Sequence, residues 1–509
     1  MPVLNPTKEG VSKEPSLIDA ITPIIILVSF LSLSVYVFES DASYGPNQVT
    51  LIVAAIVAGV IGYKNGCSWE QIHAGITNGI HSAMGAILIL ISVGMLIGSW
   101  ILSGTVPTLL VYGLDILSPT WFYVSSCFVS AIVAISIGSS WSTAGTIGVG
   151  LIGISNSLGL DPGITAGAII SGAYMGDKMS PLSDSTNLAP SIAGSELFSH
   201  IRHMTWTTVP AFAISLVLFT ILGFNQAVEV NTQEVAVIKE AIQAEFDIGA
   251  HLLIPMLVLL ALARLKIPAL PTVLIGSIVG FLFALIFQQE TILRLVDNID
   301  NLPTQLVLFK GIWSTAFGGY AAATDNEMVK ELLSKGGMIS MLNTVWLIIC
   351  ALTFGGVMES TKLLQKLVNY VLKNVKTARG LIISTLAAAF GTNVVASDQY
   401  MSIVLPGRAF KAEYEKQGLD PLNLSRALED AGTVTSVLIP WNTCGAFMTA
   451  TLGVNTFVYL PYAFFNILSP IIGVVFAMTL FKVLYKSKKT LAQEPLSQAF
   501  NTATVRETQ

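Results

Sequence analysis

Charged residues are scarce in this sequence. Only 11% of its 509 residues are Asp, Glu, Lys or Arg, whereas 53% are hydrophobic. A soluble domain carries roughly a quarter charged residues, so the composition excludes an ordinary soluble globular protein. The formal net charge of −5 says little, because most charges fall in short loops. We expect no nucleic-acid partner.

Clustered cysteine and histidine are also lacking. The four cysteines lie far apart, mostly inside apolar segments, which excludes a disulfide framework or a thiolate metal site. No metal-ligand, nucleotide or nucleophile motif is present, so we expect neither an enzyme nor a cofactor. Histidine can titrate near neutral pH, but His200 and His203 are interpreted as interfacial side chains at a cytoplasmic helix end.

Long apolar runs, by contrast, recur along the whole chain. Each is about 20 residues long, enough to cross a hydrocarbon core of ~30 Å as a helix. An outer-membrane barrel is excluded, because its strands alternate over about ten residues. The sequence therefore predicts an all-α polytopic membrane protein in a lipid bilayer.

The apolar runs fall into two sets of seven, separated by a polar stretch. The first set is predicted at residues 19–38, 49–63, 83–103, 119–138, 141–158, 163–180 and 200–223. The second set is predicted at residues 249–264, 268–287, 338–358, 380–395, 396–407, 421–445 and 456–482. Several runs are short or rich in Gly, Ser and Thr, which is typical of half-helices or re-entrant segments. The corresponding domains are a cytoplasmic tail 1–18, a first membrane repeat 19–223, an extracytoplasmic connector 224–248, a second membrane repeat 249–482 and a cytoplasmic tail 483–509.

Basic residues predict the orientation. Lys and Arg gather in loops on the cytoplasmic side of a membrane. One such cluster follows the last span, and others mark further inside turns: Arg264, Lys266, Lys362, Lys366, Lys373, Lys376, Arg379, Arg408, Lys411, Lys416, Lys482, Lys486, Lys488 and Lys489. Both termini are therefore predicted to be cytoplasmic, in a bacterial inner membrane. Residues 288–337 are assigned to the extracytoplasmic side although they contain basic residues.

The two halves resemble each other. Gly159–Pro162 reads Gly-Leu-Asp-Pro, as does Gly418–Pro421, and each is followed after the same interval by a helix-breaking proline, Pro181 or Pro440. Matched stretches carry opposite charge bias. An odd number of spans between equivalent points inverts one half relative to the other, as in secondary transporters. We therefore predict two inverted-topology repeats with broken helices.

The two broken elements, residues 172–187 and 430–443, are predicted to hold an ion site near the midplane. Proline removes a backbone donor, and freed carbonyls and hydroxyls offer the oxygen ligands that hard cations prefer. An ionisable carboxylate lets a proton compete for the same place. The candidates for ion binding and proton coupling are Asp177, Asp184, Ser183, Thr186, Asn187, Asp430, Thr435, Asn442 and Thr443, with Asp177 and Asp184 as the Na⁺ carboxylates.

Two of these aspartates have a structural alternative. Asp177 and Lys178 would merely end a helix at the membrane surface, and Asp430 would pair with Arg426, one turn away on the same helix face.

Further polar residues in apolar surroundings are candidates too. A lone aspartate such as Asp398 costs several kcal/mol in a membrane, which favours function or a partner such as Arg408. Asn393 lies near it in the sequence, and Glu359 is either functional or interfacial.

The stretch Gly172–Ala189 strongly resembles the signature of the NhaC-type sodium/proton antiporters. Residues Ala396–Tyr400, Leu405–Arg408 and Pro440–Gly445 also look like this family, and the similarity covers nearly the whole chain. The resemblance implies antiport of cytoplasmic Na⁺ against external H⁺ by alternating access, with these two ions and the lipid bilayer as partners.

A relative within the family exchanges malate for lactate with coupled H⁺ and Na⁺. An organic-anion exchanger, with Arg408 or helix N-termini holding a carboxylate, therefore stays open as the alternative. The sequence also leaves a homodimer open. A channel or receptor is disfavoured, because no selectivity-filter repeat or soluble ligand domain is present.

Overall fold

The structure is a computed structural model. It describes residues 13–38, 45–116, 118–181, 183–225, 232–265, 267–296, 302–324, 326, 329–330, 333–373 and 375–486. Lys266, Lys488 and Lys489, which the orientation argument used, lie outside the described residues, as do most of the two predicted tails.

The described chain is built from helices. In the first half these are α1 (Leu17–Phe38), α2 (Pro46–Lys64), α3 (Trp69–Ser82), α4 (Met84–Leu102), α5 (Thr105–Ile116), α6 (Pro119–Ile137), α7 (Ser140–Thr143), the π-helix η2 (Ala144–Gly148), α8 (Val149–Ser157), α9 (Pro162–Met179), α10 (Asp184–Ala193), α11 (Leu197–Asn225) and α12 (Thr232–Glu245).

The second half continues with η3 (Ala250–Leu253), α13 (Ile254–Arg264), α14 (Ala269–Phe287), α15 (Gln289–Leu295), α16 (Thr304–Gly318), η4 (Met338–Met341), α18 (Leu342–Ser360), α19 (Leu363–Lys373), α20 (Ala378–Ala396), α21 (Gln399–Lys416), α22 (Pro421–Leu428), the π-helix η5 (Glu429–Thr433), η6 (Ser436–Leu438), α23 (Thr443–Leu452), α24 (Thr456–Tyr459), η7 (Leu460–Tyr462) and α25 (Phe464–Thr479).

The apolar helices confirm a multi-pass membrane protein. Seven helices of the described chain are long and apolar enough to cross a membrane, and up to ten if three bent pairs each form one span. This is fewer than the two sets of seven segments predicted, because helices such as α9 are glycine-rich and carry charged residues. The bent pairs are α4 with α5 (67°), α12 with α13 (84°) and α24–η7 with α25 (56°).

The helix breaks predicted at the two prolines are confirmed. α9 ends at Met179, two residues before Pro181, and α10 begins at Asp184. In the second half, η6 ends two residues before Pro440, and α23 begins three residues after it. Proline disrupts a helix because it lacks the N–H donor and clashes with the preceding turn.

Helix bounds recur along the chain at a constant spacing of 259 residues. This spacing takes Pro119–Ile137 to Ala378–Ala396 and Asp184–Ala193 to Thr443–Leu452, and it takes Pro162–Met179 to residues 421–438, where α22 begins and η6 ends. The helix caps follow the same spacing: Asp161 and Asp420 cap α9 and α22, and Ser183 and Asn442 cap α10 and α23. The two halves therefore repeat one order of elements, and their inverted orientation stays a prediction.

Close packing places α9 in the interior. A Cβ atom on Gly172 would lie 2.0 Å from the carbonyl oxygen of Cys127, and one on Gly176 would lie 2.4 Å from that of Ala131. Glycine at both positions lets α9 approach the α6 backbone closely, as small residues do between membrane helices. This packing carries the C-terminal turn of α9, with Asp177 and Lys178, into the middle of the protein.

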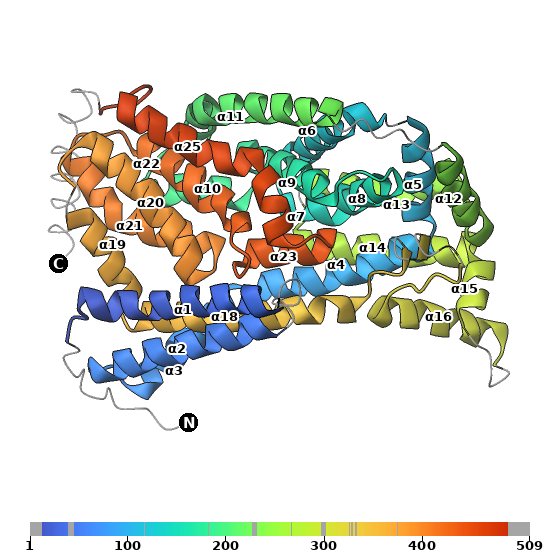
Figure 1. Ribbon diagram of the computed structural model, residues 1–509, viewed down its shortest axis with the longest axis horizontal. Helices are drawn as coiled ribbons and strands as arrows, with labels where there is room; N and C mark the ends of the chain where they lie inside the picture. The colour runs from blue at the N-terminus through green and yellow to red at the C-terminus, as the bar shows by residue number, and fades with distance from the viewer. Residues whose placement is uncertain are drawn as a thin grey trace, which may run out of the picture.

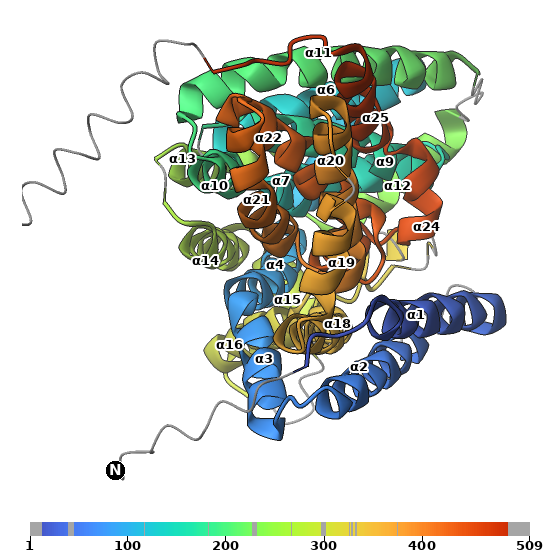
Figure 2. The same ribbon diagram turned by 90° about the vertical axis from the view of Figure 1, so that its left-hand side faces the viewer.

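The helices lie in layers along the long axis. Figure 1 shows α1, α2, α3 and α18 along one edge and α11 along the opposite edge, with α7, α9, α10 and α23 between them. Figure 2 shows the α1–α3 layer beside the main body of helices. One end of the molecule holds α19, α21 and α22, and the other holds α12, α15 and α16 (Figure 1).

Candidate functional site

A buried ion pair joins the two broken elements. The Lys178 ammonium, at the end of α9, donates to Oδ1 of Asp430 in η5 and, at 3.0 Å, to the Ser469 hydroxyl in α25. The Thr207 hydroxyl of α11 also donates to Asp430 Oδ1, at 2.8 Å. Lys178 is 0% and Asp430 1% exposed. The pair therefore lies in the protein interior, and its further hydrogen-bond partners come from two more elements, α11 and α25.

Asp177 points to a different partner. Its Oδ2 accepts hydrogen bonds from the backbone N–H of Ser140, at 3.0 Å, and from the Ser140 hydroxyl, at 2.7 Å. Ser140 is the first residue of α7, so the carboxylate lies at a helix N-terminus, which stabilises negative charge.

Glu429 adds a further buried carboxylate. It is 0% exposed, and neither of its carboxylate oxygens has a hydrogen-bond partner among the described residues. Oδ2 of Asp430 also lacks one. Both residues belong to the π-helix η5, a rare form that is frequent at functional sites.

Arg426 completes the group, one helical turn before Asp430. It is 2% exposed and donates to the carbonyl oxygen of Lys482 at 3.2 Å. The predicted alternative, an Arg426–Asp430 ion pair, is wrong for this structure, because Lys178 takes the Asp430 carboxylate. We call Asp177, Lys178, Arg426, Glu429 and Asp430 the buried charge cluster.

The buried charge cluster holds more acidic than basic groups. Its three carboxylates face one ammonium and one guanidinium, which leaves one negative charge in excess when all groups are ionised. An uncompensated buried charge costs several kcal/mol, and removing a carboxylate's hydrogen bonds adds to that cost. Binding one proton or one monovalent cation removes the excess.

Most of the other candidates in the first broken element hold the break itself together. The Thr186 hydroxyl donates to the carbonyl oxygens of Asp177 (3.2 Å) and Lys178 (3.0 Å). The Asn187 amide donates to those of Pro181 (2.9 Å) and Ser183 (2.7 Å). The Ser183 hydroxyl caps α10.

The second broken element gathers its amides and hydroxyls into one network. The Asn393 amide donates to the carbonyl oxygen of Gly432 at 2.6 Å and to the Thr435 hydroxyl at 3.1 Å. The Asn442 amide donates to Oδ1 of Asn393 at 3.1 Å. Thr443, which follows Asn442, donates its backbone N–H to the carbonyl oxygen of Ser397. The network ties the end of α20 to the break after η6.

A family model described as the Na⁺/H⁺ antiporter family matches residues 172–480, a region that contains both breaks and the whole buried charge cluster. The chain belongs to this family. It is 38% identical to the Na(+)/H(+) antiporter NhaC of Alkalihalophilus pseudofirmus, over 89% of this chain and 93% of that protein.

Other relatives of this antiporter-family chain carry different names. It is 35% identical to the malate-2H(+)/Na(+)-lactate antiporter of Bacillus subtilis, over 89% of this chain and 93% of that protein. It is also 35% identical to the arginine/ornithine antiporter ArcD of Halobacterium salinarum, over 96% and 97% of the two chains. These relatives are all named as transporters.

Four of the predicted charged candidates lie outside the buried charge cluster. Asp398 is buried, but it caps α21 by accepting the Met401 N–H at 3.0 Å. Arg408 is exposed and makes no ion pair with it within the described chain. Glu359 is exposed in the last turn of α18, which favours its interfacial interpretation. Asp184 is exposed at the first residue of α10.

Sequence reasoning missed several residues of the site. Lys178 was interpreted only as a helix end, and Glu429, Ser140, Thr207 and Ser469 were not considered. Adjacent acidic residues at 429–430 inside an otherwise apolar segment were the available signal. The interfacial interpretation of His200 and His203 is wrong, because both are buried, and no described residue hydrogen-bonds either ring nitrogen of His200.

Proposed function

We propose that this antiporter-family chain exchanges cytoplasmic Na⁺ for external H⁺ by alternating access. The observation that carries the proposal is the single excess negative charge of the buried charge cluster. A proton and a sodium ion each neutralise one charge, so binding of one disfavours binding of the other. Such competition couples inward movement of protons to outward movement of sodium.

The carboxylates Asp177, Glu429 and Asp430 are the proposed exchange groups. Glu429 and Oδ2 of Asp430 have unused acceptor oxygens, and hard cations prefer oxygen ligands. Asp184, exposed at the start of α10, is proposed to meet ions entering at the break. Thr435, Asn442 and Thr443 are proposed to shape the opposite break.

We propose a bacterial inner-membrane location with both termini cytoplasmic. Basic residues support it: Lys373 ends α19 and Lys416 ends α21, and these helices lie at one end of the molecule (Figure 1). Cytoplasmic faces carry an excess of Lys and Arg.

Everted membrane vesicles with a pH-sensitive dye test the exchange. Adding NaCl should dequench the dye without any organic acid, and Asp177→Asn should abolish the response. Glu413→Gln is the matched control, because this carboxylate lies in the last turns of α21 and hydrogen-bonds the Gln417 side chain outside the cluster. Full Na⁺ response in Asp177→Asn would count against the assignment of that residue.

A second candidate is a Na⁺- and H⁺-coupled organic-anion exchanger. The relative named as a malate-2H(+)/Na(+)-lactate antiporter favours it. In the same vesicles, a Na⁺ response that requires malate or lactate would support this exchanger over simple antiport.

A further inference from the structure

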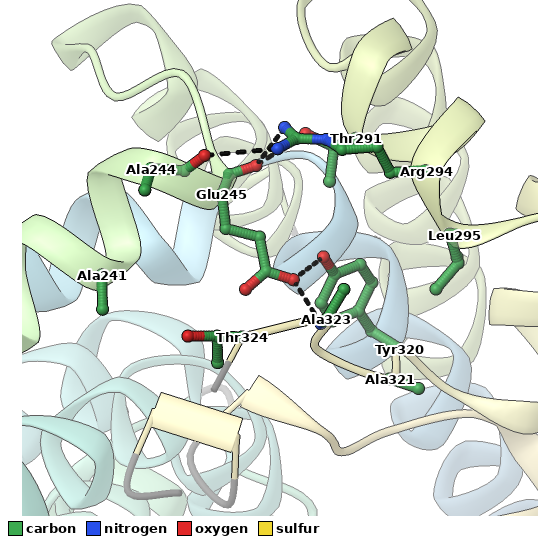
Figure 3. Close-up of a pocket in the computed structure, with 10 residues that line it drawn as sticks. All are labelled: Ala241, Ala244, Glu245, Thr291, Arg294, Leu295, Tyr320, Ala321, Ala323 and Thr324. Atoms are coloured by element: carbon green, nitrogen blue, oxygen red, sulfur yellow. Dashed lines mark hydrogen bonds between the residues drawn. The ribbon is translucent and has the colours of Figure 1, made fainter. Parts of the chain in front are cut away.

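A polar pocket lies at the end of the molecule away from α22 and the buried charge cluster. It is a cavity of about 190 Å³ between α12, α15 and the segment that follows α16 (Figure 3). Its lining includes Ala241, Glu245, Arg294, Tyr320 and Thr324. Ala244, Ala321 and Ala323 at its rim are exposed, so an ion reaches the pocket from outside the protein.

Glu245 contributes an acidic side chain to the lining of this pocket. The residue is 7% exposed. Its Oε1 accepts the Tyr320 hydroxyl at 2.5 Å and the Ala323 N–H at 2.9 Å, while Oε2 has no hydrogen-bond partner within the described part of the chain. Figure 3 shows the carboxylate extending from α12 toward Tyr320, with the second oxygen on the other side. Burial and the neighbouring Glu245 raise the pKa of Tyr320, so its hydroxyl stays protonated and donates.

Arg294 does not neutralise this carboxylate directly. Its guanidinium donates to the carbonyl oxygens of Ala244 (3.3 Å) and Glu245 (3.0 Å), at the C-terminal end of α12. A basic side chain is favourable there, because the last carbonyls of a helix lack partners. The described chain shows no ion pair between Arg294 and the Glu245 carboxylate, and Figure 3 shows the two on opposite sides of the Glu245 main chain.

We propose that this pocket is a second cation site, in which Glu245 Oε2 binds a monovalent metal ion such as Na⁺. Buried carboxylate oxygens without partners favour a cation, and the Thr324 hydroxyl oxygen is a further ligand of the kind that hard cations prefer. The cavity exceeds the volume of several waters at about 30 Å³ each, so the ion keeps part of its hydration shell. The site is separate from the buried charge cluster and does not depend on it.

Thermal unfolding of the purified full chain in detergent tests the site. The measurement uses the Asp430→Asn background, so that the buried charge cluster is already altered, and compares NaCl with choline chloride at equal ionic strength. A ligand that binds only the folded state raises the unfolding temperature, and a rise of roughly 1–3 °C in NaCl is expected.

Two variants remove the binding in different ways. Glu245→Gln removes the charge, and Ala241→Met fills the cavity while keeping the carboxylate, so both should abolish the NaCl-dependent rise. Glu240→Gln, an exposed carboxylate on the same helix, should keep it. A rise that persists in both pocket variants would overturn the site. An equal rise of the unfolding temperature in choline chloride would overturn the choice of a metal cation. So would a Glu245-dependent rise with free glycine, which carries an organic ammonium group, but not with NaCl.

Discussion

The two halves of the chain share a scaffold but not its charges. In the first half, Ser140 at the start of α7 donates to Asp177 near the end of α9. At a spacing of 259 residues, Gln399 starts α21 and accepts the hydroxyl of Ser436 in η6, at 3.2 Å. The same contact between equivalent elements is therefore made with a carboxylate in one half and with neutral groups in the other.

The ion pair shows the same asymmetry. The position equivalent to Lys178 is Val437, and the position equivalent to Asp430 is Ser171, whose hydroxyl accepts the Phe465 N–H at 3.3 Å. Each half thus contributes one partner to the Lys178–Asp430 pair, and neither half holds the pair alone. A repeated fold can place equivalent breaks together. A few equivalent positions with different residues then make the two halves contribute different chemical groups to the site.

The largest expected effect comes from substituting the two equivalent but chemically different residues, Asp430 and Ser171, one at a time. Asp430→Asn should lower sodium-driven proton exchange at least about 100-fold, which corresponds to roughly 3 kcal/mol, because Lys178 loses its charged partner. Ser171→Ala, at the equivalent position, should keep the rate within about twofold, since each 1.36 kcal/mol changes a rate tenfold. Initial dye responses in everted vesicles measure both, and similar losses in the two variants would contradict the asymmetry.

Substitutions of Lys178 and of the equivalent Val437 should differ in how much they lower the stability of the protein. Lys178→Met leaves Asp430 buried without its cation and should destabilise by about 3–5 kcal/mol. Val437→Ala removes only apolar contacts and should cost about 2 kcal/mol. Thermal unfolding in detergent compares them, and the double variant Lys178→Met/Asp430→Asn should recover much of the lost stability. No recovery in the double variant would mean that the pair is not the cause.

Glu429 should set the pH dependence of sodium binding. If a proton competes with Na⁺, the apparent Na⁺ affinity of the unaltered chain falls as the pH is lowered. Glu429→Gln removes the excess charge, so its exchange should be weak and its Na⁺ dependence flat with pH. Rates measured across a pH series, with Glu413→Gln as the control, test this. An unchanged pH profile in Glu429→Gln would remove Glu429 from the exchange.

The smallest effects should come from residues that the two halves share. Asp161 accepts the Ile164 N–H and Asp420 accepts the Leu422 N–H, each at 3.0 Å, at the starts of α9 and α22. Replacing either cap by alanine should cost about 1 kcal/mol. Similar shifts in unfolding temperature would support equivalent roles, and a large transport defect in only one variant would show that this cap does more than hold its helix.

Much of the fold could be predicted from the sequence, because neighbouring residues alone indicate a membrane helix and its ends. The apolar runs, the breaks at Pro181 and Pro440, and the repeated Gly-Leu-Asp-Pro are all short-range patterns. The fourteen predicted segments exceed the seven to ten spans of the described chain, because glycine-rich helices such as α9 do not have the hydropathy of ordinary spans.

The site was only partly accessible, because its decisive contacts are long-range. Lys178 and Asp430 are 252 residues apart, and nothing local distinguishes a lysine that ends a helix at the surface from one buried against a distant aspartate. Conversely, the hydroxyl and amide of Thr186 and Asn187 suggested ion ligands, whereas the structure gives them backbone carbonyls of the break. The sequence shows which residues are polar, but the packing of distant helices determines which partners they have.

Proton release on sodium binding is the most direct test of the buried charge cluster as the exchange site. In weakly buffered detergent solution near neutral pH, adding NaCl to the purified chain should release protons, and choline chloride should release none. Glu429→Gln and Asp430→Asn should lose this release, whereas Glu413→Gln should keep it. Sodium-dependent proton release of unchanged size in both Glu429→Gln and Asp430→Asn would contradict the buried charge cluster as the exchange site.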